Sequence, residues 1–288
     1  MGLVSCIEMM EDANRRGYAI GQFNLNNMES IRAFLQAAQE NRSPVILGVS
    51  GGTAKYMGGY RTIVSTVEGF IDFIGITVPV ALHVDHGTYD EALQAVKAGF
   101  RSVMFDGSAL PFEENLAKTQ EMSRLCREAG VSLECEVGAI GGEEDGVASM
   151  GEFADPEECR LMSGSGAHML AAGIGNIHGK YPSDWPGLRF DVLERIREVT
   201  DGLPLVLHGG SEIPADMVRR AIALGVRKVN VNTECQIAFA QALRQYFEEG
   251  RDLKPKGFVT RTMLADGVKA LQRVATEKME LFGSAGKA

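Results

Sequence analysis

Three of the five histidines in the sequence lie at the ends of short apolar segments, where together they could bind a catalytic metal ion. His86 directly follows VPVALHVD, His208 directly follows PLVL, and His178 comes two residues after the end of MLAAGIGN. Three neutral imidazoles with an open fourth position are typical of catalytic zinc. A single histidine in such a place is more typical of a hydrogen-bonded structural residue, so their shared position is what favours a metal site. We expect His83 and His168 to be structural.

All eight apolar segments of the chain end in side chains that bind metals, transfer protons or form hydrogen bonds. These residues are Asn24, Asn26, Ser50, Asp85, Asp106, Glu134, Glu136, Asn176, Ser211, Asn230 and Asn232. Contact with solvent explains asparagine and serine at such ends. A carboxylate beside a metal ligand, as Asp85 is beside His86, is suited to acid/base work. Successive strand residues point to opposite faces, so we expect the strand to end at this pair.

Two segments predict a phosphate site. HGGS at 208–211 offers the amides of Gly209 and Gly210 and the Ser211 hydroxyl, and VNVNT at 229–233 precedes a predicted helix. Helix N-termini and glycine-rich turns bind anions, although the glycines could also serve only a tight turn. A third segment, GGEEDG at 141–146, is either a solvated loop tip or a lid that carries a carboxylate over the site.

The elements that position these residues alternate along the whole chain. Amphipathic helical segments separate eight apolar segments, at 18–26, 44–50, 78–85, 102–107, 131–138, 169–176, 204–210 and 227–232. Eight strand–helix units in this length predict an α/β fold, a (β/α)8 TIM barrel, whose strand ends meet at one mouth. A doubly wound sheet would carry a glycine fingerprint after its first strand, and none is present. We expect one domain over 1–288, with long active-site loops at 139–154 and 177–188.

Composition narrows the class of protein. The chain has 288 residues and a net charge of −9, which argues against nucleic acid as a partner because a phosphate backbone requires a basic surface. The five cysteines include no C-x-x-C pair, which favours reduced thiols. No apolar segment has the length of a signal peptide or a membrane span, so we expect no membrane association and a cytoplasmic location.

The motifs resemble the class II, zinc-dependent fructose-bisphosphate aldolases, in particular their shorter bacterial branch. The matching segments extend over the chain in family order and include ALHVDHG, SVMFDGS, LECEVGAIGGEEDG, GIGNIHGKYP, LVLHGGSEIP and VNVNTECQIAF. The resemblance implies a TIM-barrel lyase that reversibly cleaves fructose 1,6-bisphosphate into dihydroxyacetone phosphate and glyceraldehyde 3-phosphate in glycolysis and gluconeogenesis. It also implies a homodimer or homotetramer.

The resemblance implies a role for each matching residue. Asp85 would handle the proton of the C4 hydroxyl, and Glu144 would move a proton on the dihydroxyacetone carbon. The zinc ligands would be His86, His178 and His208, with Asp106 and Glu136 at an alternative or outer metal position. The substrate and its phosphates would be bound by Asn24, Ser50, Gly179, Gly209, Gly210, Ser211, Asn230, Asn232, Thr233 and, from a neighbouring subunit, Arg261. A monovalent cation, Na⁺ or K⁺, would lie near the phosphate.

Two departures from the family pattern leave the sugar open. Glu212 replaces the usual glycine after HGGS, and Lys180 precedes Tyr181 where many relatives have a lysine after the tyrosine. We expect Glu212 to point outward, where the following helix N-terminus favours an acid. The alternatives are an aldolase for tagatose 1,6-bisphosphate or 2-deoxy-5-keto-gluconate 6-phosphate, a Schiff-base aldolase using Lys180 or Lys228, and a metal- or phosphate-binding barrel without catalysis.

Overall fold

Eight parallel strands close into a barrel in the computed structural model, which describes residues 2–144 and 147–288. The barrel strands run in the order β1-β11-β10-β8-β5-β4-β3-β2. Their bounds are β1 (Ile20–Asn24), β2 (Val45–Val49), β3 (Val80–Gly87), β4 (Ser102–Phe105), β5 (Ser132–Val137), β8 (Met169–Ala172), β10 (Leu205–Leu207) and β11 (Val226–Val231). Each overlaps one of the eight predicted segments. The predicted (β/α)8 barrel is confirmed.

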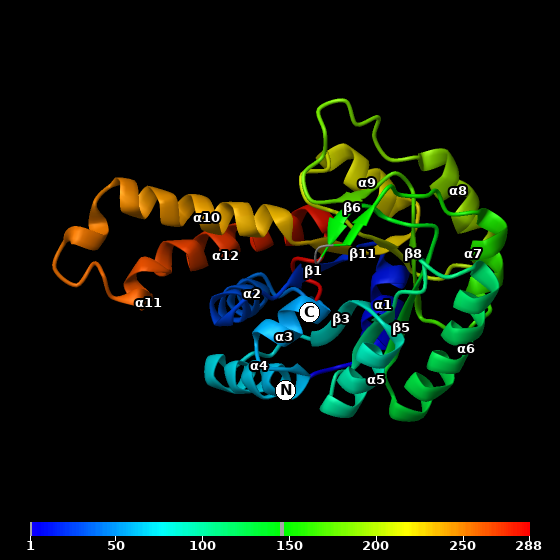
Figure 1. Ribbon diagram of the computed structural model, residues 1–288, viewed down its shortest axis with the longest axis horizontal. Coiled ribbons are helices and arrows are strands. Elements are labelled where there is room, and N and C mark those ends of the chain that lie inside the picture. The colour runs from blue at the N-terminus through cyan, green and yellow to red at the C-terminus, as the bar shows by residue number, and fades with distance from the viewer. Residues whose placement is uncertain (1, 145–146) are drawn as a thin grey trace.

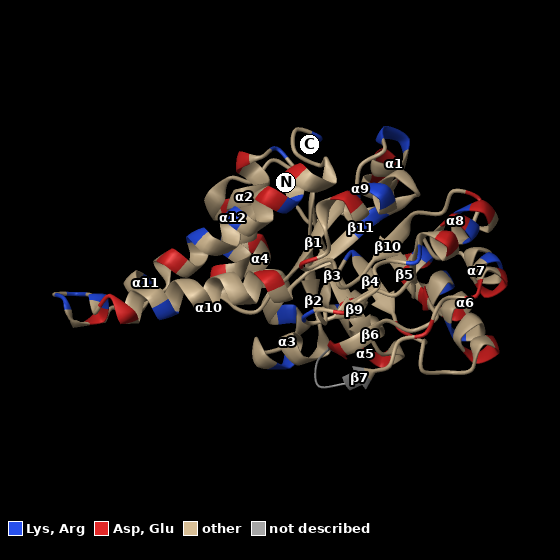
Figure 2. Ribbon diagram, turned by 90° about the horizontal axis from the view of Figure 1, so that it is seen from above, with Lys and Arg blue, Asp and Glu red and all other residues tan. Residues whose placement is uncertain are grey.

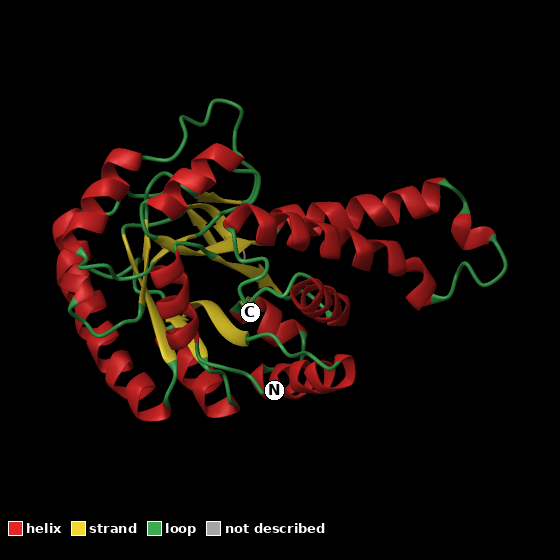
Figure 3. Ribbon diagram, turned by 180° about the vertical axis from the view of Figure 1, so that it is seen from behind, coloured by secondary structure: helices red, strands yellow, loops and turns green. Residues whose placement is uncertain are grey.

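Helices surround the barrel, as Figure 1 and, from behind, Figure 3 show. They are α2 (Met28–Glu40), α3 (Gly51–Tyr56), α4 (Tyr60–Ile74), α5 (Tyr89–Ala98), α6 (Phe112–Ala129), α7 (Pro156–Ser163), α8 (Phe190–Val199), α9 (Ala215–Ala223) and α10 (Thr233–Glu248). The apolar core between helices and strands is continuous around the barrel. No helix in the described ranges combines the length and apolar character that crossing a membrane requires.

The N-terminal helix α1 (Cys6–Arg16) closes the barrel at the N-terminal ends of its strands. Its buried residues Cys6, Met9 and Met10 pack with inward-facing strand residues such as Ile46 and Met104. The amide of Cys6 also donates to the hydroxyl of Ser132, the first residue of β5. Apolar side chains therefore fill this end of the barrel. The functional site is expected at the opposite end, where the strands have their C-terminal ends.

A helical arm projects from the barrel, and the sequence did not predict it (Figure 1). The far half of α10, the 3-10 turn η1 (Arg251–Leu253), α11 (Thr260–Met263) and α12 (Ala265–Phe282) form it. The two long helices pack closely, because a Cβ atom at Gly267 would lie 2.5 Å from the ring of Phe239. Acidic and basic residues are interspersed along this arm and over the outer helices (Figure 2).

The two long connections contain a small sheet rather than loop alone. Strands β6 (Gly141–Glu144) and β7 (Val147–Ser149) pair antiparallel, and β6 pairs with β9 (Ile177–His178). The sequence predicts both segments as loops, since each strand is only two to four residues long and shows no alternation. Pairing between segments more than thirty residues apart stabilises them, and local sequence carries no sign of that pairing.

Candidate active site

The three predicted metal-ligand histidines come together at the mouth of the barrel. Their ring centroids lie 4.5 Å (His86 to His208), 4.8 Å (His86 to His178) and 5.8 Å (His178 to His208) apart. One nitrogen from each ring lies within 4.8 Å of the other two, close enough to share one ion. Burial and the neighbouring His86 charge lower the pKa of His178 to about 3, which keeps that imidazole neutral, as a metal ligand must be.

A β-bulge allows both Asp85 and His86 to face the mouth. The pairing of β3 with β4 shifts register between Val84 and Gly87, and His86 has a φ of +48°. The strand therefore continues through Gly87 instead of ending at the Asp85–His86 pair, which corrects the sequence-based expectation. A bulge re-aims a side chain without ending the strand. Immediately afterwards, Thr88 forms a capping box at the start of α5 and fixes the direction of the chain.

His178 reaches the site from outside the barrel. The barrel strand β8 ends at Ala172, and His178 lies in β9 of the small sheet, so the ligand does not follow directly from the barrel strand as the sequence suggested. Tyr181 fixes this segment in place: its hydroxyl accepts from the amide of Ile177 at 3.1 Å and donates to the carbonyl of Gly209 at 2.8 Å. Sequence reasoning gave Tyr181 no role.

Two carboxylates adjoin the His86 ring on its outer side. The Nδ1 atom of His86 lies 2.7 Å from Asp106, which also accepts from the amide of Ser108, and 3.8 Å from Glu136. Burial disfavours a charge on His86, but the hydrogen bond with Asp106 and the carboxylates of Asp85 and Glu136 outweigh it and raise the pKa of His86 to about 10. The surroundings of this ring therefore favour positive charge.

Glu136 offers a further ligand atom. Its side chain is buried, and its Oε2 atom has no hydrogen-bond partner. Burial and the charge of Asp106 raise its pKa well above the usual range, which shows how poorly the carboxylate is compensated. This buried oxygen without a partner, grouped with His86 and Asp106, completes a donor set that could hold a metal ion. The residues at this mouth therefore fit a divalent cation.

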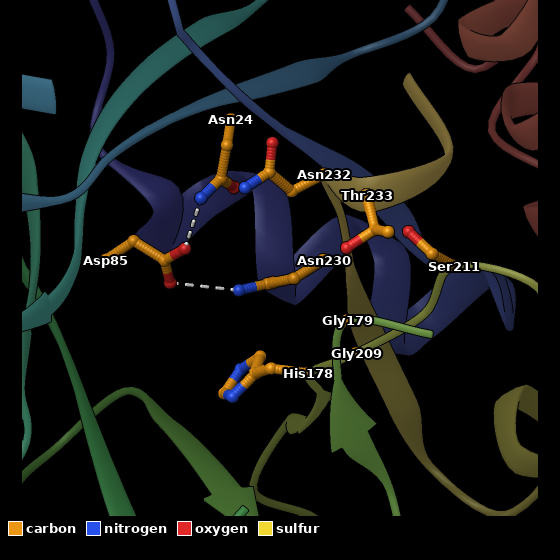
Figure 4. Close-up of a pocket in the computed structure, with 9 residues that line it drawn as sticks. All are labelled: Asn24, Asp85, His178, Gly179, Gly209, Ser211, Asn230, Asn232 and Thr233. Atoms are coloured by element: carbon orange, nitrogen blue, oxygen red, sulfur yellow. Dashed lines mark hydrogen bonds between the residues drawn. The ribbon is translucent and has the colours of Figure 1, made fainter. Parts of the chain in front are cut away.

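Asp85 is held rigidly beside the histidines. Asn24 donates to one of its oxygens at 2.8 Å and Asn230 donates to the other at 3.0 Å (Figure 4). Burial alone would raise the pKa of Asp85, but the charges of His86, His208 and Lys228 outweigh it and hold that pKa well below its usual range. Asp85 is therefore a carboxylate, able to accept a proton next to the metal position.

The predicted phosphate residues line a small pocket that opens beside Asp85 and His178 (Figure 4). Its lining consists of Asn24, Asp85, His178, Gly179, Gly209, Ser211, Asn230, Asn232 and Thr233, each of which the sequence predicts as a site residue. Thr233 is the first residue of α10, so a helix N-terminus faces the pocket and favours an anion there. Gly209 is required because a Cβ atom would meet the carbonyl of Ile177 at 2.1 Å.

Four predicted site residues are not seen at the site. Three of them do not line the pocket, and the side chain of the fourth is not described. Gly210 donates its amide to the carbonyl of Asn230 and Ser50 caps α3, and neither is among the residues lining the pocket. Arg261 is on α11 in the arm, away from the barrel mouth (Figure 1). Glu144 ends β6 next to residues 145–146, and its side chain lies outside the described part of the chain.

Two buried residues support the site in a way that the sequence did not predict. Glu134 and Lys228 are fully buried inside the barrel, and the first contacts His208. Strand alternation in VRKVNV, which places Lys228 on the same face as Asn230, is the signal that could have identified the lysine. His83, expected to be structural, is also fully buried, with its Nδ1 2.7 Å from the hydroxyl of Ser102.

Comparison with known proteins decides the family. The model of the family "Fructose-bisphosphate aldolase class-II" matches residues 4–287. The chain belongs to this family. Among its relatives, fructose-bisphosphate aldolase of Streptococcus pyogenes serotype M1 is 49% identical over 293 residues, covering all of both chains. The Mycoplasma pneumoniae enzyme of the same name is 48% identical over 288 residues, which cover 99% of this chain and all of that one.

Solved structures agree with this assignment. The YdjI aldolase of Escherichia coli K12 is 31% identical with a TM-score of 0.83, and the match covers 99% of each chain. A putative fructose-1,6-bisphosphate aldolase of Coccidioides immitis is 30% identical with a TM-score of 0.86, covering 97% of this chain and 96% of that one. The predictions of a class II aldolase and of a lyase are confirmed.

Proposed function

We propose that this class II aldolase reversibly cleaves fructose 1,6-bisphosphate into dihydroxyacetone phosphate and glyceraldehyde 3-phosphate, as in glycolysis and gluconeogenesis, with Zn²⁺ as its metal. One observation carries the proposal: Asp85, a carboxylate, lies between three clustered histidines and a pocket that ends at a helix N-terminus. This arrangement supports a metal, a base and a phosphate that would lie along one opening. The 48–49% identical relatives named fructose-bisphosphate aldolase support the choice of sugar.

Cleavage requires a proton to leave the C4 hydroxyl as the bond between C3 and C4 breaks. Asp85 accepts this proton, and the bonding electrons pass to C3 as an enediolate. A Zn²⁺ ion held by His86, His178 and His208 would supply Lewis-acid stabilisation of the developing negative charge. The enediolate carbon then gains a proton, a step we assign to Glu144. Asn24 and Asn230 keep the Asp85 carboxylate in place throughout.

The ketone-side phosphate binds at the N-terminus of α10. Gly179, Gly209, Ser211, Asn232 and Thr233 line that end of the pocket, and we include Gly210 and Ser50 as neighbours that shape it. None of these seven residues is basic, so backbone amides, hydroxyl groups and the helix dipole provide the attraction. We propose a monovalent cation, Na⁺ or K⁺, at the same place, since it would offset the phosphate charge.

Asp106 and Glu136 provide an alternative or outer metal position next to His86. The unpartnered Oε2 of Glu136 supports this role, because a carboxylate oxygen buried without a donor is stabilised by a nearby cation. The shared His86 would allow an ion to lie nearer the histidines or nearer the carboxylates.

The second phosphate requires a cation that the described pocket of one chain does not provide. We propose that Arg261 of the partner subunit supplies it in a homodimer or homotetramer. Its position on α11 in the projecting arm (Figure 1) supports a role between copies. So do the exposed apolar side chains of Phe247 in α10, Leu253 in η1 and Phe258 just before α11. We propose a cytoplasmic location, supported by five cysteines that are all free and buried.

The alternatives to this proposal are other substrates and another mechanism. An aldolase for tagatose 1,6-bisphosphate or 2-deoxy-5-keto-gluconate 6-phosphate would use the same metal and base. A Schiff-base mechanism is disfavoured because the Lys228 ammonium is buried and paired with Glu134 at 2.8 Å. Lys180 is exposed, but it would leave the three histidines without a role.

A cleavage assay tests the proposal. Purified protein is given each of the three sugar phosphates, with and without a chelator, and the release of dihydroxyacetone phosphate, which cleavage of all three would yield, is followed. We expect the highest kcat/KM with fructose 1,6-bisphosphate, loss of activity with chelator, and recovery on adding Zn²⁺. A higher kcat/KM with one of the other two sugar phosphates would identify that compound as the substrate. Inactivation by borohydride in the presence of substrate would overturn the metal mechanism.

A further inference from the structure

Lys228 is a charged residue in the interior of the barrel that the proposed chemistry does not use. It is fully buried on β11, and its ammonium lies 2.8 Å from Glu134 Oε2 and 2.8 Å from Asn230 Oδ1. Glu134 is on β5, which is separated from β11 by β10 and β8 in the barrel order. The two side chains therefore meet across the barrel interior, directly beneath the histidines.

Glu134 connects this ammonium to a metal-ligand histidine. Its Oε1 atom lies 2.8 Å from Nε2 of His208, and both side chains are fully buried. A carboxylate with its charge neutralised by a lysine accepts hydrogen bonds only, so Nε2 of His208 must carry the hydrogen. The lone pair of this ring is then on Nδ1, the only ring nitrogen that could bind a metal in this tautomer.

Lys228 also decides the orientation of Asn230. An ammonium group can only donate, so the Asn230 atom facing it must be the carbonyl oxygen. The amide NH₂ group then faces Asp85, where it donates at 3.0 Å, and lies 3.2 Å from Nδ1 of His208. A reversed amide would place an oxygen against the carboxylate of Asp85. One buried ammonium thus determines two neighbouring polar groups of the site.

We infer that Lys228 is a positioning residue, which acts through Glu134 and Asn230 to present Nδ1 of His208 to the metal and to hold the proton-accepting oxygen of Asp85. The inference rests on the proposed metal-dependent function. A simple structural role is the alternative, because any buried carboxylate needs a compensating charge. The two differ in whether metal binding changes when the fold is retained.

The test uses the full-length protein, freed of metal by dialysis against a chelator. Zn²⁺ affinity is measured by competition with a chromophoric chelator, and ligand geometry by the d–d absorption of the Co²⁺-loaded protein. In Lys228→Met we expect the dissociation constant of Zn²⁺ to rise by about 10- to 100-fold, the usual effect of losing an outer partner of a ligand. We also expect an altered Co²⁺ spectrum and a fall in kcat larger than the rise in KM.

Lys278→Met is the matched control. This lysine is also buried and paired with a carboxylate, Glu234, and among the described residues no hydrogen bond or ion pair links it to a histidine. The Zn²⁺ affinity of this variant should stay within about twofold of the wild-type value. That change is much smaller than the one expected on losing an outer partner of a metal ligand. If Lys228→Met does not fold, the double variant Lys228→Met/Glu134→Gln removes both buried charges, and weakened Zn²⁺ binding is expected there as well.

A folded variant with wild-type Zn²⁺ affinity and an unchanged Co²⁺ spectrum would overturn the inference. So would a ¹⁵N NMR measurement on the unmodified metal-free protein that places the His208 hydrogen on Nδ1, and this measurement needs no variant. Failure of the wild type itself to bind Zn²⁺ would instead contradict the proposed function. The two failures are therefore distinguishable.

Discussion

The ammonium of Lys278 lies 2.6 Å from the carboxylate of Glu234, and the same carboxylate oxygen accepts the amide hydrogen of Glu212 at 3.2 Å. In return, the amide of Glu234 donates to the hydroxyl of Ser211. Lys278 belongs to α12, the arm helix, and Glu234 to the first turn of α10. A side chain of the arm thereby fixes the turn that lines the phosphate pocket.

Lys278→Met should weaken substrate binding without affecting the metal. Loss of a charge-assisted partner should lower the free energy of unfolding by about 1–3 kcal/mol. The loosened turn should raise KM for fructose 1,6-bisphosphate by roughly tenfold, equivalent to about 1.4 kcal/mol of binding. Steady-state kinetics and urea denaturation measure both values. An unchanged KM in a destabilised variant would limit the pair to a structural role.

Glu212 occupies a backbone conformation that favours glycine. Its φ is +61° and its side chain is exposed, in agreement with the expectation that the acid points outward. Left-handed backbone costs a residue other than glycine about 1–2 kcal/mol, and glycine loses about 0.5–1 kcal/mol in chain entropy. Glu212→Gly should therefore raise the free energy of unfolding by roughly 0.5–1 kcal/mol, the difference between these two effects.

Steady-state kinetics distinguish backbone strain at Glu212 from repulsion between its carboxylate and the substrate phosphate. If Glu212 points outward, Glu212→Gly leaves KM for fructose 1,6-bisphosphate nearly unchanged. Glu212→Ala is the matched control, since it removes the charge and keeps the strained backbone. A large fall in KM in both variants would show that the carboxylate repels the phosphate, contrary to the outward orientation.

The barrel and the ligand set could be predicted from local patterns. Each barrel strand is an apolar run with a polar residue at its end, and in a closed parallel barrel all such ends meet. His86 and His208 were therefore predictable as neighbours although 122 positions separate them, and His178 was grouped with them although it lies in β9, outside the barrel. The same reasoning identified Asp85 and the pocket residues Asn230 and Thr233.

The rest depended on contacts between distant segments. The bulge that turns His86 toward Asp85 exists only in the pairing of β3 with β4. The strand that carries His178 is stabilised by pairing with β6, not by its own two residues. The sequence offers Lys228 only as a candidate Schiff-base lysine, and its pairing role is evident only from its partner Glu134, on a strand across the barrel.

Asp85→Asn tests the proton transfer directly. The amide keeps the shape of the side chain but is a poor base, so kcat should fall by about 10²- to 10⁴-fold, the usual contribution of a general base. Asn24→Ala, which removes one donor to the carboxylate, should have a smaller effect. Zn²⁺ content of the purified variants, measured by atomic absorption, should match the wild type. Asp85→Asn with near-normal kcat would exclude Asp85 as the base.

A mixing experiment tests whether Arg261 acts across subunits. Arg261→Ala should raise KM for the bisphosphate by about 10- to 100-fold, because a charged hydrogen bond to phosphate contributes about 1.5–3 kcal/mol. Asp85→Ala should be nearly inactive. Denatured and refolded together, the two variants would form hybrid oligomers in which one site combines a normal Asp85 with a normal Arg261. In an equal mixture of dimers, about half of the oligomers are hybrids, so roughly a quarter of all sites should recover wild-type KM. If Arg261 acts within its own chain, no mixture regains a site with low KM, and light scattering of the same samples shows whether hybrids of the expected size had formed.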